Sequence, residues 1–198
     1  MTRREKYLER IYTLFSTESI EGLTMSDIAD RIHITKMTLY NNFKDKNEII
    51  ESVINYRSRK YIEYFEKVDC HNKNAIEVLI AVLEFQRKNP LMVSHLYISL
   101  LNNYPEQFKE HEERFRNGLR SFIRQNILQG QKEAIFRADV DAEEISSYLI
   151  MTMDNMLSSA VKSGVKIDLN EVHKNLIKYH IRGIANEKGL KILQDKTK

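Results

Sequence analysis

The sequence predicts an all-α fold in two parts, because apolar residues recur at the three- and four-residue spacing of helices along almost the whole chain. Only 6 glycines and 2 prolines interrupt the 198 residues, which leaves few turn residues for the hairpins of an all-β protein. Three short apolar stripes occupy the first part of the chain, and longer stripes occupy the rest. We therefore expect an N-terminal three-helix domain over residues 1–46 and a larger helical domain over residues 47–198.

The three short helices have recognisable beginnings. An apolar stripe over residues 7–15 predicts the first helix. Thr24 followed by Asp27 resembles a capping box and predicts the start of the second helix. Thr35 is the expected N-cap of the third helix. The tight break between the second and third helices falls at His33, where the turn needs a residue that tolerates a positive φ.

From residue 47 onward the predicted helices are longer, and prolines or glycines mark several of their ends. They are a fourth helix beginning at residue 47, a helix over residues 75–86, one opened by Pro90, one from Pro105 to Gly130, one over residues 143–161 and one over residues 168–186. Residues 131–140 are predicted as a connector, and the charged tail after Gly189 is expected to fray. No proline- or serine-rich linker separates the two parts, so the fourth helix should join them directly.

Three short helices with a tight break between the second and the third match a helix-turn-helix, whose last helix enters the major groove of DNA. Ala29 is small enough to let the two helices cross closely, and apolar residues such as Ile28 and Leu39 hold them together. Residues 31–46 carry four basic residues against one acidic residue, so a positive patch accompanies the motif. DNA binding through this patch should weaken as the salt concentration rises.

The composition agrees with a folded protein whose charge is only locally basic. Hydrophobic residues make up 42% and charged residues 30% of the chain, and the net charge is +3. Cys70 is the single cysteine, which excludes an internal disulfide and a multi-cysteine zinc site and indicates a reducing compartment. No stretch has the length and apolarity of a signal peptide or a membrane span, so we expect a cytoplasmic protein without a membrane partner.

Two segments carry a resemblance to a known family. Residues 22–29 read GLTMSDIA and residues 34–46 read ITKMTLYNNFKDK. Together they resemble the TetR family of transcriptional regulators, most specifically in the Thr-Leu-Tyr-x-x-Phe-x-x-Lys pattern of residues 38–46. The resemblance covers residues 5–55 well and continues beyond them as a similar pattern of helices. Three residues depart from the family pattern: His33 at the usual turn glycine, Met37 where a small residue is common, and Asn42 where histidine is common.

The resemblance implies a DNA-contacting surface made of two groups of residues. The first group would contact phosphates through hydroxyls or a positive charge: Thr24, Tyr40, Lys46, and Thr38, which could instead reach a base edge. The second group would reach base edges in the major groove: Thr35, Lys36, Met37 and Asn41. Taken alone, Tyr40 could simply pack against its own chain and Lys46 could be a solvated surface lysine.

The resemblance also implies that the larger domain binds a small molecule and forms a two-fold homodimer through a four-helix bundle. The last two long helices would build the dimer interface with Leu149, Thr152, Met153, Met156, Leu176, Ile177, His180, Ile181 and Ile184. The ligand pocket would be lined by Phe85, Met92, His95, Leu96, Tyr97, Phe122, Arg124, Tyr148, Met151 and Asn155. Both sets could instead be ordinary core, and the ligand class stays open between aromatic, lipidic and cationic compounds.

The resemblance, together with these residues, implies a homodimeric repressor that a small-molecule ligand would release from a palindromic DNA operator. The alternative is a helical ligand-binding or protein-interaction module without sequence-specific DNA binding, an interpretation that the three departures from the family pattern motivate. An enzyme is a third hypothesis, but no phosphate-binding glycine loop and no nucleophile signature supports it, so we expect neither catalysis nor a cofactor. His173 and His180 share a helix face, but two ligands make a poor metal site, so no metal is expected.

Overall fold

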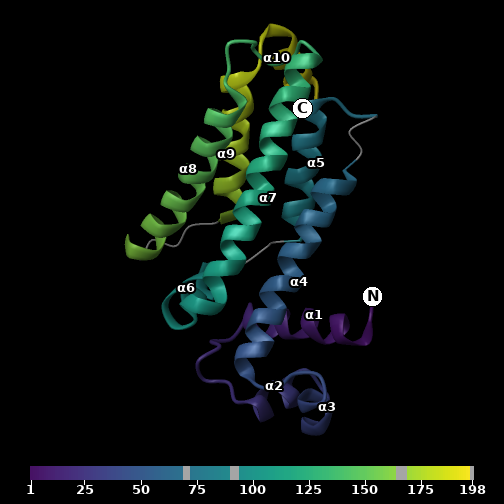
Figure 1. Cartoon of the computed structure of the whole chain (residues 1–198), viewed down its shortest axis with the longest axis vertical. Coiled ribbons are helices and arrows are strands. Elements are labelled where there is room, and N and C mark those ends of the chain that lie inside the picture. Colours follow the sequence, from purple (N-terminus) through teal and green to yellow (C-terminus); the bar gives the residue numbers. More distant parts are fainter. Residues whose placement is uncertain (69–71, 90–93, 164–168, 197–198) are drawn as a thin grey trace. The chain divides into compact units, whose positions relative to one another are not determined.

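The computed structural model describes residues 1–68, 72–89, 94–163 and 169–196, and this part of the chain is helical and contains no β-strand (Figure 1). In chain order the helices are α1 (Arg3–Phe15), α2 (Met25–Arg31), α3 (Lys36–Tyr40), α4 (Lys46–Lys67), α5 (Ala75–Lys88), α6 (Ser94–Asn103), α7 (Pro105–Lys132), α8 (Ala142–Ser163), α9 (Leu169–Ile184) and α10 (Glu187–Lys196). The all-α prediction is confirmed. None of the helices in the described ranges is long and apolar enough to cross a membrane.

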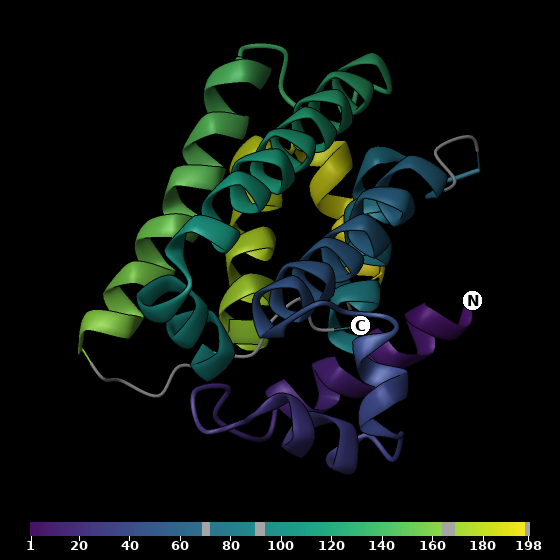
Figure 2. The same cartoon turned by 60° about the horizontal axis from the view of Figure 1, so that its bottom comes forward.

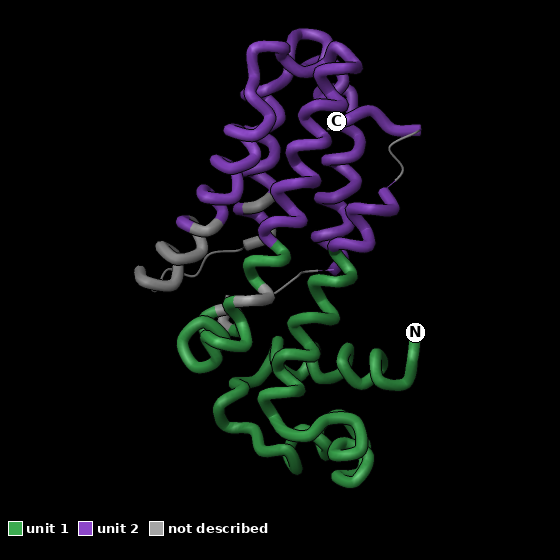
Figure 3. Tube along the Cα trace, in the orientation of Figure 1, with its two compact units in different colours: residues 1–61, 91–115 green, residues 62–90, 116–198 purple. Residues whose placement is uncertain are grey.

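The helices form two compact units, which Figure 3 shows in different colours. Unit 1 comprises residues 1–61 and 91–115, and unit 2 comprises residues 62–90 and 116–198. Helices α4 and α7 therefore each begin in unit 1 and end in unit 2. The predicted domain boundary lies at residue 46, where the fourth helix begins. In the structure, most of α4 belongs to the same unit as α1 to α3.

Charged and aromatic side chains attach α4 to α1 inside unit 1. The Glu9 carboxylate of α1 accepts a hydrogen bond of 3.0 Å from the hydroxyl of Tyr56 and forms ion pairs with Arg57 and Lys60 of α4. The guanidinium of Arg57 also lies over the ring of Tyr12, 4.1 Å from its centroid, which is a cation–π contact. These contacts make the first part of α4 a structural component of the N-terminal unit.

The expected caps form the beginnings of the short helices. The Thr24 side chain accepts a hydrogen bond from the Asp27 backbone N–H, and the Asp27 carboxylate accepts one from the Thr24 N–H, so α2 begins with a complete capping box. Thr35 caps α3 in the predicted way. A further capping box, between Thr2 and Glu5, begins α1 and was not part of the sequence prediction.

Stacked aromatic rings hold the end of α4 against its neighbours in unit 2. The rings of Tyr64 and Phe85 stack with centroids 3.9 Å apart, which joins α4 to α5. The rings of Phe65 and Phe122 stack at 4.6 Å, which joins α4 to α7. Aromatic pairs of this kind add stabilisation beyond their buried area, about 0.5–1.5 kcal/mol each. These two ring stacks therefore help to fix the packing of α4 against α5 and α7 within unit 2.

The connector between α7 and α8 falls at the predicted residues, and two glycines let it pack closely. A Cβ on Gly130 would lie 2.1 Å from the ring of Phe136, and a Cβ on Gly189 would lie 2.2 Å from the backbone oxygen of Ile135. Phe136 also forms an isolated antiparallel bridge with Ala185. The connector thus lies directly on the end of α7 and the start of α10, and both glycines are required by this contact.

The expectation that the tail after Gly189 frays is wrong for residues 190–196, because these described residues belong to helix α10. The Asn186 side chain accepts a hydrogen bond of 3.1 Å from the Gly189 N–H and so stabilises the first turn. Leu193 is buried, and Lys196 forms an ion pair of 2.7 Å with Glu77 of α5. The charge of this segment lies on its outer face, while its apolar residues pack within unit 2.

Candidate nucleic-acid interface

Helix α3 is short and is held by its neighbours in the chain. The Thr35 hydroxyl oxygen accepts a hydrogen bond of 3.1 Å from the Thr38 N–H, and Leu39 is fully buried. The turn before α3 closes with a hydrogen bond of 3.0 Å from the Ile34 N–H to the Ala29 oxygen. His33 in this turn has a φ of 56°, so the predicted left-handed residue is confirmed. The turn and the cap together fix the direction of α3 against α2.

Most of the predicted DNA-contacting side chains lie on the outer side of unit 1, where Figures 1 and 2 show α2 and α3 at its edge. Met37 is 74% exposed and Tyr40 is 47% exposed, although both are large apolar or aromatic residues. The other exposed members of the set are Thr24, Thr35, Lys36 and Asn41, while Thr38 and Lys46 are half-buried. The structure therefore brings the predicted set together around α3.

Local hydrogen bonds already occupy several of these polar groups. The hydroxyls of Thr35 and Thr38 lie 2.8 Å apart and bond to each other. The Thr24 hydroxyl bonds to the carboxylate of Asp27. A phosphate that accepts a hydrogen bond from one of these hydroxyls must therefore replace or share a hydrogen bond within the helix cap. The exposed Tyr40 hydroxyl can approach a phosphate without that cost.

Lys46 stands at the start of α4 and points back toward the loop before α2. Its Nζ donates a hydrogen bond of 3.4 Å to the backbone oxygen of Glu21. Partial burial lowers the pKa of Lys46, and the nearby Glu21 carboxylate opposes this shift. At the same helix end, the Glu48 N–H donates to the Asp45 carboxylate at 2.9 Å, so this amide is already satisfied. At the start of α4, the Lys46 ammonium is therefore the group that can pair with a phosphate.

Two arginines of α1 support this surface, and the sequence analysis did not identify them. Arg4 donates hydrogen bonds to the backbone oxygen of Asn42 at 3.4 Å and to Glu48 at 3.2 Å. Arg10 donates a hydrogen bond of 3.2 Å to the backbone oxygen of Ile32, directly before the turn. The sequence separations of 22 to 44 residues leave no local pattern that could reveal these contacts.

Glu21 is a further unpredicted residue, and it joins the loop before α2 to α6. Its carboxylate accepts hydrogen bonds from the hydroxyls of Ser19 and Ser99 and, at 2.6 Å, from the side-chain amide of Asn103. The hydrogen bonds from Ser19 and Ser99 lower the pKa of Glu21 to about 2. Because Ser99 and Asn103 belong to α6, this helix is anchored to the loop that leads into the helix-turn-helix.

The predicted pocket residues do not line one cavity in the described part of the chain. Phe85 and Phe122 belong to the two ring stacks of unit 2, whereas Leu96 is buried in unit 1. Arg124 forms an ion pair of 2.9 Å with Glu143 at the surface. The remaining described members, Tyr148, Met151 and Asn155, are exposed on α8. Met92 and the side chains of His95 and Tyr97 lie outside the described residues.

The residues predicted for the dimer interface divide between core and surface. Leu149, Ile177, Ile181 and Ile184 are buried within unit 2, which corresponds to the alternative of an intramolecular core. Met153, Leu176 and His180 are half-buried, Thr152 is exposed, and the Met156 side chain lies outside the described residues. Burial lowers the pKa of His180 to about 4. Among the described side chains of α8 and α9, the large apolar or aromatic ones that are exposed are Tyr148, Met151 and Tyr179.

The fold and the exposed α3 together define a helix-turn-helix protein with a second, helical unit. Residues 8–53 match the family model of the bacterial regulatory proteins of the tetR family. The chain is 28% identical over 109 residues to IcaR, the HTH-type negative transcriptional regulator of the biofilm operon icaADBC in Staphylococcus aureus strain Newman. That alignment covers 53% of this chain and 56% of the relative, so the chain spans little more than half the length of this relative.

Two further comparisons extend over more of the chain. It is 26% identical over 161 residues to an HTH-type transcriptional regulator of Staphylococcus aureus strain USA300, covering 72% of this chain and 85% of that protein. Among solved structures, SmeT, the repressor of the Stenotrophomonas maltophilia multidrug efflux pump SmeDEF, has the same fold, with a TM-score of 0.68, 14% identity and coverage of 94% and 92% of the two chains. The helix-turn-helix segment of the chain, residues 8–53, is thus similar to the TetR family of bacterial regulatory proteins.

Proposed function

We propose that the protein is a transcriptional repressor that binds a DNA operator through α3 and the start of α4. The observation that carries this proposal is the contrast within α3, where Leu39 is fully buried while Met37 and Tyr40 are exposed. A short helix held on one side and open on the other can enter a major groove. IcaR is a negative regulator and SmeT is a repressor, which supports repression over activation. Its location would be the cytoplasm, where bacterial DNA lies.

The repressor would act as a two-fold homodimer on a palindromic operator, because two copies of α3 then enter successive major grooves about 34–36 Å apart. Tyr148 and Met151 on α8 and Tyr179 on α9 support the outer faces of these helices as the interface, since exposed large apolar side chains favour a contact surface. Gly183, one turn after Tyr179, has open space at its Cβ position, which leaves room for a helix of a second copy.

A small molecule bound in unit 2 would release the operator. Helices α4 and α7 contribute to both units, so a change in their position in unit 2 can alter unit 1. Within unit 1, Glu21 links α6 to the loop before the helix-turn-helix, and Lys46 contacts the same residue. A ligand that binds better to dimers with wrongly spaced α3 helices would shift the population off DNA.

The proposal is tested by selecting duplexes that the purified, full-length protein retains from a random pool. We expect an enriched palindrome with half-sites one helical turn apart. Binding to the selected duplex should weaken in Tyr40→Phe and Lys46→Gln proteins. If the folded protein enriches no palindrome, the alternative of a ligand-binding or protein-interaction module without sequence-specific DNA binding replaces the repressor.

A further inference from the structure

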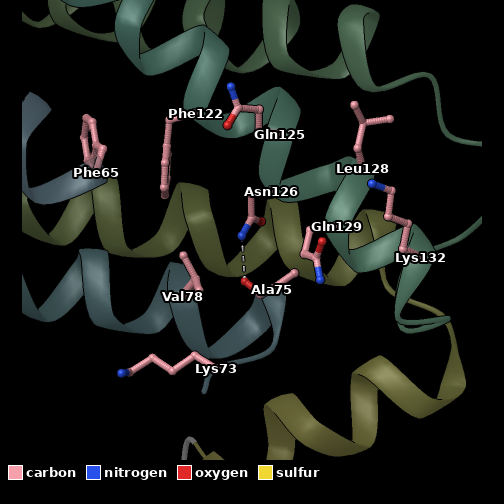
Figure 4. Close-up of a pocket in the computed structure, with 10 residues that line it drawn as sticks. All are labelled: Phe65, Lys73, Ala75, Val78, Phe122, Gln125, Asn126, Leu128, Gln129 and Lys132. Carbon is pink, nitrogen blue, oxygen red and sulfur yellow. Dashed lines mark hydrogen bonds between the residues drawn. The ribbon is translucent and has the colours of Figure 1, made fainter. Parts of the chain in front are cut away.

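Unit 2 contains a cavity of about 320 Å³ between α5 and α7, with one ring contributed by the end of α4 (Figure 4). Of the residues that the sequence analysis assigned to a pocket, Phe122 belongs to its lining. Small-molecule sites have volumes of about 300–1,000 Å³, so the cavity suits a ligand at the small end of that range. The chemistry of its walls indicates which small molecule it fits.

The apolar wall of the cavity is aromatic. Phe65 and Phe122 stack with centroids 4.6 Å apart and ring planes 18° from parallel. Phe122 is half-buried, so part of its ring faces the opening. Val78 of α5 lies on the same side of the lining in Figure 4. A flat aromatic ring packs favourably against such a surface, in an offset-stacked or edge-on arrangement.

Two lysines give the cavity a positive charge. Lys73 and Lys132 both line it, and Figure 4 shows them on opposite sides with Asn126 between them. Neither ammonium group has an ion pair or a hydrogen bond with the described part of the chain. The nearby carboxylates are occupied: Glu133 accepts a hydrogen bond of 2.9 Å from the first N–H of α5, and Glu77 is paired with a lysine of α10. Lys73 acts on the Glu77 carboxylate through its charge without forming an ion pair, so both ammonium groups can still pair with an anion.

The N-terminus of α5 adds to this preference. Ala75, the first residue of α5, lines the cavity, so the positive end of the helix dipole lies at the cavity wall. The first amides of α5 are already bonded, to Glu133 and to the cap residue Asn74. An anion would consequently be bound by the lysine side chains, with the helix dipole as a favourable background.

A buried amide in the wall lacks one of its partners. Asn126 is only 7% exposed, and its Nδ2 donates a hydrogen bond of 3.0 Å to the Ala75 oxygen. Its Oδ1 has no hydrogen-bond donor within the described residues. A buried acceptor without a donor is unfavourable, so a ligand hydroxyl that reaches this oxygen through a small shift of the lining would be stabilised. The Nδ2 contact fixes which end of the amide is the acceptor.

We propose that this cavity binds a small aromatic carboxylate that also carries a hydroxyl group. The ring packs against Phe122, the carboxylate pairs with Lys73 or Lys132, and the hydroxyl donates to the Oδ1 of Asn126. The inference rests on the proposed function, since it names the ligand class for the ligand-binding unit. The sequence alone is compatible with aromatic, lipidic and cationic ligands, whereas the two lysines in the lining favour an anion.

The proposal is tested by isothermal titration calorimetry on the full-length protein without DNA, with 6-hydroxy-2-naphthoate as the probe. We expect saturable binding of one molecule per chain. Removing the hydroxyl, in 2-naphthoate, should raise Kd about fivefold, and replacing the carboxylate, in 2,6-dihydroxynaphthalene, should raise it about tenfold or more. The Lys73→Gln/Lys132→Gln double variant should bind the probe about tenfold more weakly. Lys178→Gln, a change at an exposed lysine of α9, serves as the matched control and should leave Kd unchanged.

The outcomes separate this inference from the repressor proposal. Absence of saturable probe binding, equal affinity for the uncharged diol, or an unchanged Kd in the double variant overturns the ligand class. The ligand series needs no mutation, so it remains decisive even if a variant folds poorly. DNA binding by the ligand-free protein is measured separately. Intact DNA binding with failed calorimetry overturns the ligand class alone, and failed DNA binding overturns the repressor while the calorimetric result stands.

Discussion

Glu21 and Lys46 meet at the base of the helix-turn-helix, where the Lys46 Nζ donates a hydrogen bond of 3.4 Å to the Glu21 backbone oxygen. The Glu21 carboxylate is bonded at the same time to Asn103 of α6 at 2.6 Å. One residue of the loop before α2 therefore contacts both the start of α4 and the end of α6. The predicted phosphate-binding lysine and α6 are thereby connected within unit 1.

Replacing Glu21 by glutamine should destabilise the protein at neutral pH, because hydrogen bonds to a charged acceptor are stronger than those to an amide oxygen. Glu21 is exposed, so we expect a loss of about 1 kcal/mol or less in the free energy of unfolding. Urea unfolding of the wild-type and Glu21→Gln proteins at pH 7 measures this difference.

The difference in the free energy of unfolding between the wild-type and Glu21→Gln proteins should depend on pH. The hydrogen bonds lower the pKa of Glu21 from its ordinary value of 4.5 to about 2 in the folded protein. The stabilisation by the charged group is therefore complete above pH 4.5 and decreases as the pH falls toward 2. Comparison of the two proteins between pH 7 and pH 3 should show their stabilities converging. A constant difference across this range would contradict the assigned cause, and Glu187→Gln at an exposed position of α10 is the control.

Substitutions at Tyr40 and Lys46 should weaken DNA binding in different ways. Tyr40→Phe removes an exposed hydroxyl, so we expect an unchanged fold and a Kd about fivefold higher. Lys46→Gln removes a positive charge and should reduce the slope of log affinity against log salt concentration by about 1. Fluorescence anisotropy titrations of the selected duplex at several salt concentrations measure both effects. Lys178→Gln should change neither, and wild-type affinity of Tyr40→Phe at matched salt would exclude the phosphate role of its hydroxyl.

His33 occupies a backbone conformation that glycine adopts more readily. Its φ of 56° lies in the left-handed region, where a Cβ is unfavourable. We expect His33→Gly to raise the free energy of unfolding by up to about 1 kcal/mol and His33→Val to lower it by at least about 1 kcal/mol. Chemical denaturation of the three proteins measures the order. A His33→Val protein as stable as the wild type would show that the turn is not strained.

The outer face of α8 and α9 is the surface on which dimerisation should depend. Met151 and Tyr179 are 56% and 69% exposed, and a buried glutamate at either position would remain without a partner. Met151→Glu and Tyr179→Glu should therefore shift sedimentation velocity profiles from dimer to monomer without changing the helical content. Lys178→Glu, at a neighbouring exposed position on α9, tests whether added negative charge alone has this effect. Intact dimers in both test variants would place the interface elsewhere.

The parts of the fold that could be predicted from the sequence are those that depend on local signals. The Thr24–Asp27 capping box, the Thr35 cap and the left-handed His33 each follow from residues within a few positions of one another, and all are confirmed. The bond between Glu21 and Asn103 joins residues 82 positions apart, and no local pattern encodes it. Periodicity identified α8 and α9 but could not show which of their faces packs inside unit 2.

Two of the differences between the predicted and the observed structure have simple physical reasons. Ile177 and Ile181 belong to a helical apolar stripe, and such a stripe can pack equally well against its own chain or against a partner. The tail beyond Gly189 is rich in charge, which suggested fraying. Its order depends on the close contact of Gly189 with the connector and on the burial of Leu193, and both contacts involve residues distant in sequence.

Helix α3 has only five residues, far fewer than a helix needs to persist alone in water. The helical structure of α3 therefore depends on the surrounding fold, and unfolding of unit 1 also unfolds this proposed recognition helix. Melting and operator recognition must then be thermodynamically linked, so a bound duplex should raise the melting temperature of unit 1 by an amount that grows with the logarithm of its affinity. In the proposed repressor, thermal stability and operator occupancy would therefore be linked through the folded state of α3.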